Sequence, residues 1–79
     1  MEPIKFEGVN CVYGENQPEY QPLPAQRYPD GTITTCWKCS PEDLKKINET
    51  GVVWLSMLTF NKPLQPVLVS SEKVIPNEE

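Results

Sequence analysis

The stretch VVWLSMLTF at residues 52–60 decides most of what can be expected of the fold. Its apolar residues occupy alternating positions of both parities, which is typical of a strand buried on both faces. A turn at 61–64 and Pro66 ahead of a second strand at 67–71 predict a hairpin. Because thirteen of the twenty-four residues in 52–75 are apolar, we expect most of the core to come from here. Aromatic side chains on the predicted strands should join this core: Trp37, Trp54 and Phe60.

A helix is predicted directly before this region. Ser40 is a suitable N-cap, Pro41 suits the first helical position because its missing N–H is not needed there, and the next two residues are acidic. Gly51 supplies the stop. Leu44 and Ile47 form a thin apolar stripe on one face. We therefore expect a short helix of two to three turns that lies against a sheet.

Short strands are expected on both sides of a proline-rich segment. Residues 3–13 carry β-favouring side chains divided by Gly8, which predicts one bent strand or two short ones. The sequence Tyr-Pro-Asp-Gly at 28–31 predicts a turn, and a strand over 32–38 should follow it. Residues 14–31 contain four prolines and only four apolar residues. We expect this segment to be an irregular loop, neither a helix nor a central strand.

Together these elements predict one small α+β domain over residues 1–79. It would hold an antiparallel sheet of about four or five short strands, one short helix, the Pro-rich loop at 14–31 and a frayed acidic tail at 76–79. A chain of 79 residues has a small core. Because one strand is apolar on both faces, we also expect a homodimer that pairs strand edges or stacks sheets.

The composition excludes several classes of function. The chain has no histidine, so Ser-His-Asp and Cys-His catalysis and histidine metal ligands are closed to it, and we expect no enzyme activity. Seven Lys and Arg stand against eleven Asp and Glu, a formal net charge of −4. This acidic balance argues against binding to a nucleic acid duplex or an anionic membrane.

The compartment is predicted from what the sequence lacks. It opens without the basic and apolar regions of a secretory signal, and its longest apolar run is much shorter than a transmembrane span. Three cysteines are an odd number and too few for a disulfide framework. We therefore expect a cytoplasmic protein with reduced thiols and no membrane partner.

The string Cys36-Trp37-Lys38-Cys39 resembles a reactive motif. A thioredoxin-type redox pair would open a helix, but Cys36 lies several residues ahead of the predicted one. Zinc is the alternative, a small zinc-stabilised interaction module in which Cys11 adds a third ligand to this pair. The simplest interpretation is that Cys11 and Cys36 are small buried hydrophobes, so no metal or other cofactor is predicted.

Candidate binding residues lie in the irregular segments. Tyr20, Arg27 and Tyr28 belong to the Pro-rich loop, where aromatic and Arg side chains are typical of interface hot spots. A loop stiffened by prolines also loses less entropy on binding. Two residues complete the set: Lys62, from the turn of the predicted hairpin, and Gln65, directly after that turn. Arg27 or Lys62 would bind the phosphate of a small nucleotide ligand, with the Tyr rings available for stacking.

Much of the chain resembles a group of small uncharacterised proteins encoded by bacteriophages and prophages. The resemblance is carried by six segments: MEPI at 1–4, QPEYQPLPA at 17–25, CWK at 36–38, TGVVWLS at 50–56, LTF at 58–60 and PLQP at 63–66. Such proteins carry an apolar residue where this sequence has Cys39, which argues against a role for the Cys36–Cys39 pair.

The resemblance implies a phage-type accessory protein that acts in the bacterial host cytoplasm. With the closed catalytic routes, it favours a non-enzymatic binding protein that acts stoichiometrically on a host protein or defence component. In a second version of this hypothesis, the protein sequesters a nucleotide signal.

Overall fold

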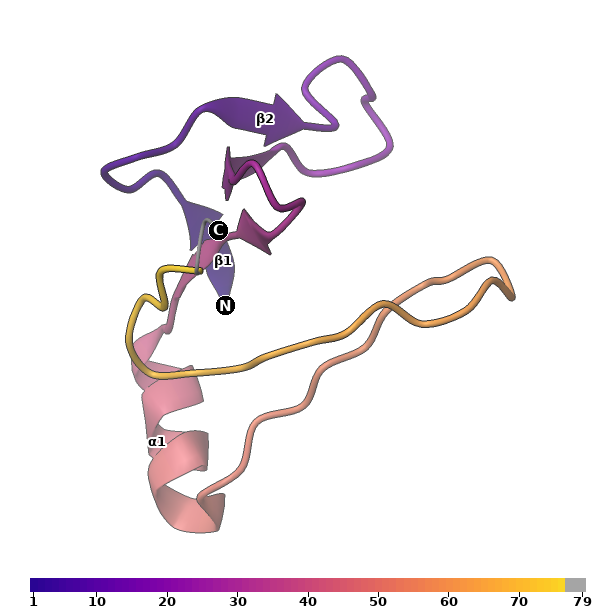
Figure 1. Cartoon of the computed structure of the whole chain (residues 1–79). Helices are drawn as coiled ribbons and strands as arrows, with labels where there is room; N and C mark the ends of the chain where they lie inside the picture. Colours follow the sequence, from indigo (N-terminus) through magenta and orange to yellow (C-terminus); the bar gives the residue numbers. More distant parts are fainter. Residues whose placement is uncertain (77–79) are drawn as a thin grey trace.

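The computed structural model describes residues 1–76 and has an α+β architecture, as predicted (Figure 1). The elements in chain order are β1 Glu2–Ile4, β2 Cys11–Tyr13, β3 Leu23–Arg27, β4 Ile33–Thr34, β5 Cys36–Lys38 and α1 Pro41–Thr50. The strands form two antiparallel sheets, β1–β5 and β2–β3–β4, where the sequence predicted one. Among the described residues, no helix has the length and apolarity to cross a membrane.

The first two strands are the two short ones that the break at Gly8 predicts. β1 pairs with β5 so that Ile4 lies opposite Cys36, and β2 pairs with β3 so that Cys11 lies opposite Ala25. Gly8, with φ of 107°, turns the chain from one sheet to the other. The strand predicted at 32–38 is split into β4 and β5, one in each sheet.

Strand β3 lies inside the segment predicted to be an irregular loop, and that prediction is wrong for residues 23–27. β3 is even the central strand of its sheet. Pro24 is tolerated because β4 pairs only with Gln26 and Arg27, so the part of β3 that carries Pro24 has a neighbour on one side alone.

Helix α1 begins and ends where its sequence signals predict. The Ser40 hydroxyl accepts a hydrogen bond from the Asp43 amide at 3.1 Å, and the Asp43 carboxylate accepts one from the Ser40 amide at 2.9 Å, which completes a capping box. At the other end Gly51 adopts φ of 68°, as left-handed C-caps do. The expected contact with a sheet is wrong: no residue of the helix is buried, and Leu44 is 51% exposed.

The capping box predicts an acid-sensitive helix start. The amide of Ser40, followed by the terminal ammonium group of Met1 at 2.9 Å, lowers the pKa of Asp43 from 3.8 to about 2. Because the pKa is lower in the folded state, this stabilisation is complete above pH 3.8 and is lost as the pH falls toward 2. Urea denaturation at several pH values should show a decline for the wild type that is smaller for Asp43→Asn. Equal declines for the two proteins would contradict the capping contact.

The C-terminal region departs most from expectation. All thirteen large apolar residues that were expected to form the core are exposed: Val52, Val53, Trp54, Leu55, Met57, Leu58, Phe60, Leu64, Val67, Leu68, Val69, Val74 and Ile75. No strand is present between residue 51 and residue 76, the last that the structure describes. The chain instead leaves α1 as an extended segment, reaches a distant tip and returns toward β1 (Figure 1).

The buried apolar residues of the described chain are Ala25 and Tyr28, both from the segment that was expected to bury little. Trp37, Trp54 and Phe60 are 48%, 92% and 69% exposed, so their assignment to the core is wrong. The physical reason is size: strands of two to five residues cannot cover a long apolar segment of the same chain. The tail predicted at 76–79 lies, apart from its first residue, outside the described residues.

Candidate functional site

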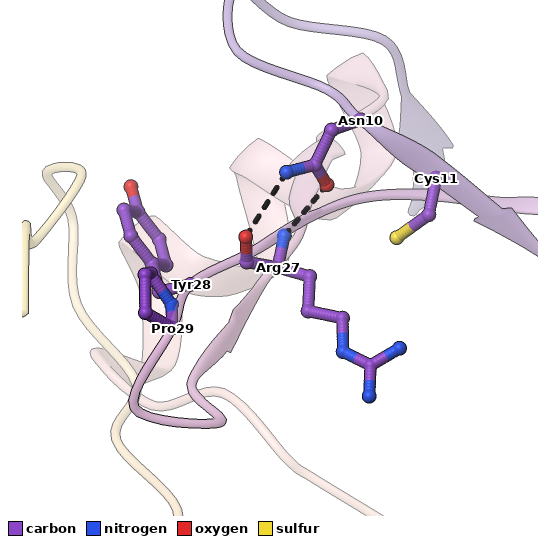
Figure 2. Close-up of a pocket in the computed structure, with 5 residues that line it drawn as sticks. All are labelled: Asn10, Cys11, Arg27, Tyr28 and Pro29. Atoms are coloured by element: carbon purple, nitrogen blue, oxygen red, sulfur yellow. Dashed lines mark hydrogen bonds between the residues drawn. The ribbon is translucent and has the colours of Figure 1, made fainter.

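An open pocket of about 510 Å³ lies where β2 begins and β3 ends (Figure 2). Its lining residues are Asn10, Cys11, Arg27, Tyr28 and Pro29. They come from two segments about seventeen residues apart in sequence, which the antiparallel pairing of β2 and β3 brings together. Two of the residues proposed for binding, Arg27 and Tyr28, therefore lie in one pocket.

A side-chain clamp fixes this part of the sheet. The Asn10 amide group donates a hydrogen bond to the Arg27 carbonyl at 3.0 Å, and its carbonyl oxygen accepts one from the Arg27 amide at 2.8 Å (Figure 2). Both bonds go to the main chain of Arg27. The guanidinium group is therefore left available while the backbone that carries it is held in place.

The turn after β3 forms the rim of the pocket. The Gly31 amide donates to the Tyr28 carbonyl and the Tyr28 amide to the Thr32 carbonyl, each at 2.9 Å. The Asp30 carboxylate accepts a hydrogen bond from the Thr32 amide at 2.8 Å, the largest of the effects that lower the pKa of Asp30. These bonds confirm the predicted turn at 28–31.

The side chains of the pocket divide its chemistry. In Figure 2 the Arg27 side chain points away from the Tyr28 ring, and its guanidinium group ends below Cys11. Tyr28 is only 8% exposed and donates its hydroxyl to the Gln26 side-chain oxygen at 3.1 Å, so its ring forms a wall and has no free face for stacking. The Cys11 thiol donates to the Ala25 carbonyl at 3.6 Å. Arg27 is the cationic residue of the lining, and its charge suits a small anionic group.

The other three predicted binding residues do not line this pocket. Tyr20 is 53% exposed on the connection between β2 and β3. Lys62 and Gln65 lie on the extended C-terminal segment. Sequence reasoning missed Asn10 and Pro29 as pocket residues. The role of Asn10 depends on the register of β2 with β3, and no local signal indicates it.

The cysteines are free thiols on different elements: Cys11 in β2, Cys36 in β5 and Cys39 after β5. Across residues 1–76, no group of three or more Cys, Asp or Glu side chains is placed to hold a metal ion, so Cys11 is not brought to the other two as a third ligand. Cys39 lines a second, smaller pocket of about 350 Å³ beside Met1 and Pro41.

Most of the large apolar side chains of the described residues are exposed. They fall into two sets, the thirteen side chains of the C-terminal region and a second group on the strands, helix and loops of the body. We call this second group the body set: Met1, Tyr13, Tyr20, Ile33, Trp37 and Leu44. Apolar surface of this extent is typical of proteins that associate with another surface.

Comparisons with models of known protein families, with curated proteins and with solved structures found no match to this chain.

Proposed function

We propose that this chain is a non-enzymatic, phage-type accessory protein that acts stoichiometrically, by binding, on a host protein or defence component. The observation that carries the proposal is the ratio of exposed to buried apolar side chains. Nineteen large apolar residues are exposed, whereas Ala25 and Tyr28 are the buried apolar residues of the described chain. Association that removes this apolar surface from water is favourable in free energy.

The same ratio argues against catalysis. An active site needs groups that are held rigidly by a packed surrounding and shielded from water. The main pocket is open and is supported by very little buried structure. Recognition by a surface makes weaker demands, because the partner supplies half of the burial.

We assign exposed side chains of the body set, which lie on several elements, to contacts with the host partner. Tyr20 is the most favourable anchor of the set, because it is 53% exposed and lies on a connection that carries Pro18 and Pro22. Tyr side chains present a large amphipathic area at low entropic cost, and prolines limit the ordering that binding requires. Trp37, half exposed on β5, provides a second aromatic group in the set.

A second candidate is sequestration of a nucleotide signal, and the position of Arg27 favours it. Arg27 lines the open pocket, and its clamp with Asn10 uses only the Arg27 main chain, so the guanidinium group is left available. A phosphate group would take bidentate hydrogen bonds from it. Pro29, which lies beside Tyr28, adds apolar surface to the lining that could face a base.

One pair of substitutions tests both versions. In affinity capture from bacterial lysate, Tyr20→Ala is expected to reduce the captured host protein at least about tenfold, whereas Tyr20→Phe, which keeps the ring, should retain it. In titration with ADP as the probe, Arg27→Gln should weaken binding about tenfold if the nucleotide version holds. Lys45→Gln on α1 is its matched control.

The results separate the alternatives. Loss of capture with Tyr20→Ala alone supports the host protein, and loss of ADP binding with Arg27→Gln alone supports the nucleotide. Turnover of a substrate by the purified chain, with neither a captured partner nor ADP binding, would contradict the proposal.

A further inference from the structure

The extended segment at residues 52–69, here called the arm, is attached to the body at both ends. It starts at the C-cap of α1. After the arm, the Lys73 ammonium group donates to the Glu7 carbonyl at 3.3 Å and lies 5.4 Å from the centre of the Phe6 ring. Between these points each large apolar side chain of the arm is at least 46% exposed. The arm is therefore held in place with its apolar surface uncovered.

The tip of the arm has the geometry of a two-residue hairpin turn. The Lys62 amide donates to the Thr59 carbonyl at 3.1 Å, and the two residues between them have positive φ, 54° for Phe60 and 64° for Asn61. Positive φ at both central positions is the mark of a type I′ turn, which matches the twist of paired strands. Beyond this turn no main-chain hydrogen bond joins the two segments of the arm among the described residues. Pairing continued from the turn would place Met57 opposite Leu64.

Pairing in that register would make both faces of the arm apolar. Cross-strand neighbours share a face. One face would carry Val53, Leu55, Met57, Leu64 and Leu68, and the other would carry Val52, Trp54, Leu58, Val67 and Val69. An arm with two apolar faces needs cover beyond what one side of its own body offers.

The prolines distinguish the two edges of the arm. In this register the Pro66 nitrogen would face inward, opposite Leu55, so one bond between the two segments could not form, whereas Pro63 removes a donor from the outer edge of the returning segment. The outgoing segment, residues 52–58, contains no proline. Its outer edge offers an uninterrupted row of main-chain donors and acceptors at alternate residues.

We propose that the arm is a dimerisation element: the outgoing segments of two copies pair antiparallel about a two-fold axis and bury Trp54 and Leu58 of each. The proposal goes beyond the proposed function, which it does not require. The apolar side chains of one arm expose on the order of 1,000 Å² in total, so a stable interface of roughly 800 Å² per partner would use most of this surface.

Two properties of the chain favour a second copy over a foreign protein. Among the described residues, the body buries only two apolar residues, Ala25 and Tyr28, so a second copy, which is present from synthesis, would add burial that one copy lacks. Each copy carries a net charge of −4, yet Lys62 is the only charged residue in 52–71. Two acidic copies therefore meet with least repulsion through their arms, and a two-fold contact closes an edge that would otherwise aggregate.

Sedimentation of the purified full-length chain tests the proposal with a matched pair of proline substitutions. Ser56→Pro removes an outward donor from the outgoing edge, and Gln65→Pro removes one from the returning edge directly across the hairpin. We expect a dimer at micromolar concentration for the wild type and Gln65→Pro. Ser56→Pro should raise the dimer dissociation constant by about 100-fold or more.

Trp54→Glu provides a second test that leaves the backbone intact. Because Trp54 is 92% exposed in one copy, its replacement does not disturb the body, and the dimer should again be lost. A wild type that is monomeric throughout, whose arm closes on its own body, would overturn the proposal. So would equal behaviour of the two proline variants, or assembly beyond a dimer. These measurements need no host protein, so they fail or succeed independently of the proposed function.

Discussion

A chain in which alanine replaces Tyr28 is expected to lose about 3 kcal/mol or more of unfolding free energy. Tyr28 is one of the two buried apolar residues of the described chain, at the end of β3 where the turn 28–31 begins. Removing its ring leaves a cavity in a body whose other buried apolar residue among residues 1–76 is Ala25. Small domains have only a few kcal/mol of stability, so the variant should be largely unfolded before urea is added. Urea denaturation followed by circular dichroism measures this.

Tyr28→Phe is the control for the ring. It removes only the hydroxyl that donates to Gln26 at 3.1 Å and should cost about 1 kcal/mol. All variants are compared at one protein concentration, because association would shift the apparent stability. If Tyr28→Ala stayed within about 1 kcal/mol of the wild type, the fold would depend on burial elsewhere, and the arm would be the candidate.

The helix was predictable because its signals are local. Ser40, Pro41 and Gly51 determine where α1 begins and ends through bonds that span at most four residues. The turn at 28–31 and the two short strands on either side of Gly8 follow in the same way from residue types at fixed offsets. None of these features depends on what the rest of the chain does.

The position of the core was not predictable. An apolar pattern indicates that a segment requires burial, but it does not indicate which surface the segment packs against. The run at 52–60 has the pattern of a doubly buried strand, yet the body is too small to cover it. Even its turn lies two residues earlier than expected, at 59–62, where Phe60 and Asn61 adopt the left-handed region. The periodicity of a segment therefore does not show which surface covers it.

The pocket was half predictable for a related reason. Arg27 and Tyr28 stand out by residue type, but the proline count of 14–31 concealed the strand that places them. One proline is compatible with β3 because β4 is too short to pair with that part of it. Asn10 forms its clamp only because β2 pairs with the segment that carries Arg27, seventeen residues away. Residue composition does not indicate that pairing.

Gly8→Ala has the second largest expected effect on folding stability, a loss of about 2 kcal/mol or more of unfolding free energy. Gly8 has φ of +107°, which side chains rarely adopt, and a Cβ atom there would lie 2.5 Å from the Gln26 side-chain oxygen. That oxygen accepts the hydroxyl of Tyr28. Alanine therefore strains the backbone between β1 and β2. It also displaces the Gln26 oxygen that accepts the hydrogen bond from the Tyr28 hydroxyl. Urea denaturation measures the loss.

Gly31 supplies the matched control for the backbone contribution. Its φ is +92°, but no atom lies within 4 Å of an added Cβ, so Gly31→Ala costs the strain alone, about 1 kcal/mol. The difference between the two glycine variants isolates the contact with Gln26, and it should disappear when both are made in a Gln26→Ala background. Equal losses for Gly8→Ala and Gly31→Ala would mean that the Gln26 side chain moves aside freely. The hydrogen bond to Tyr28 would then add little to the stability of the small core.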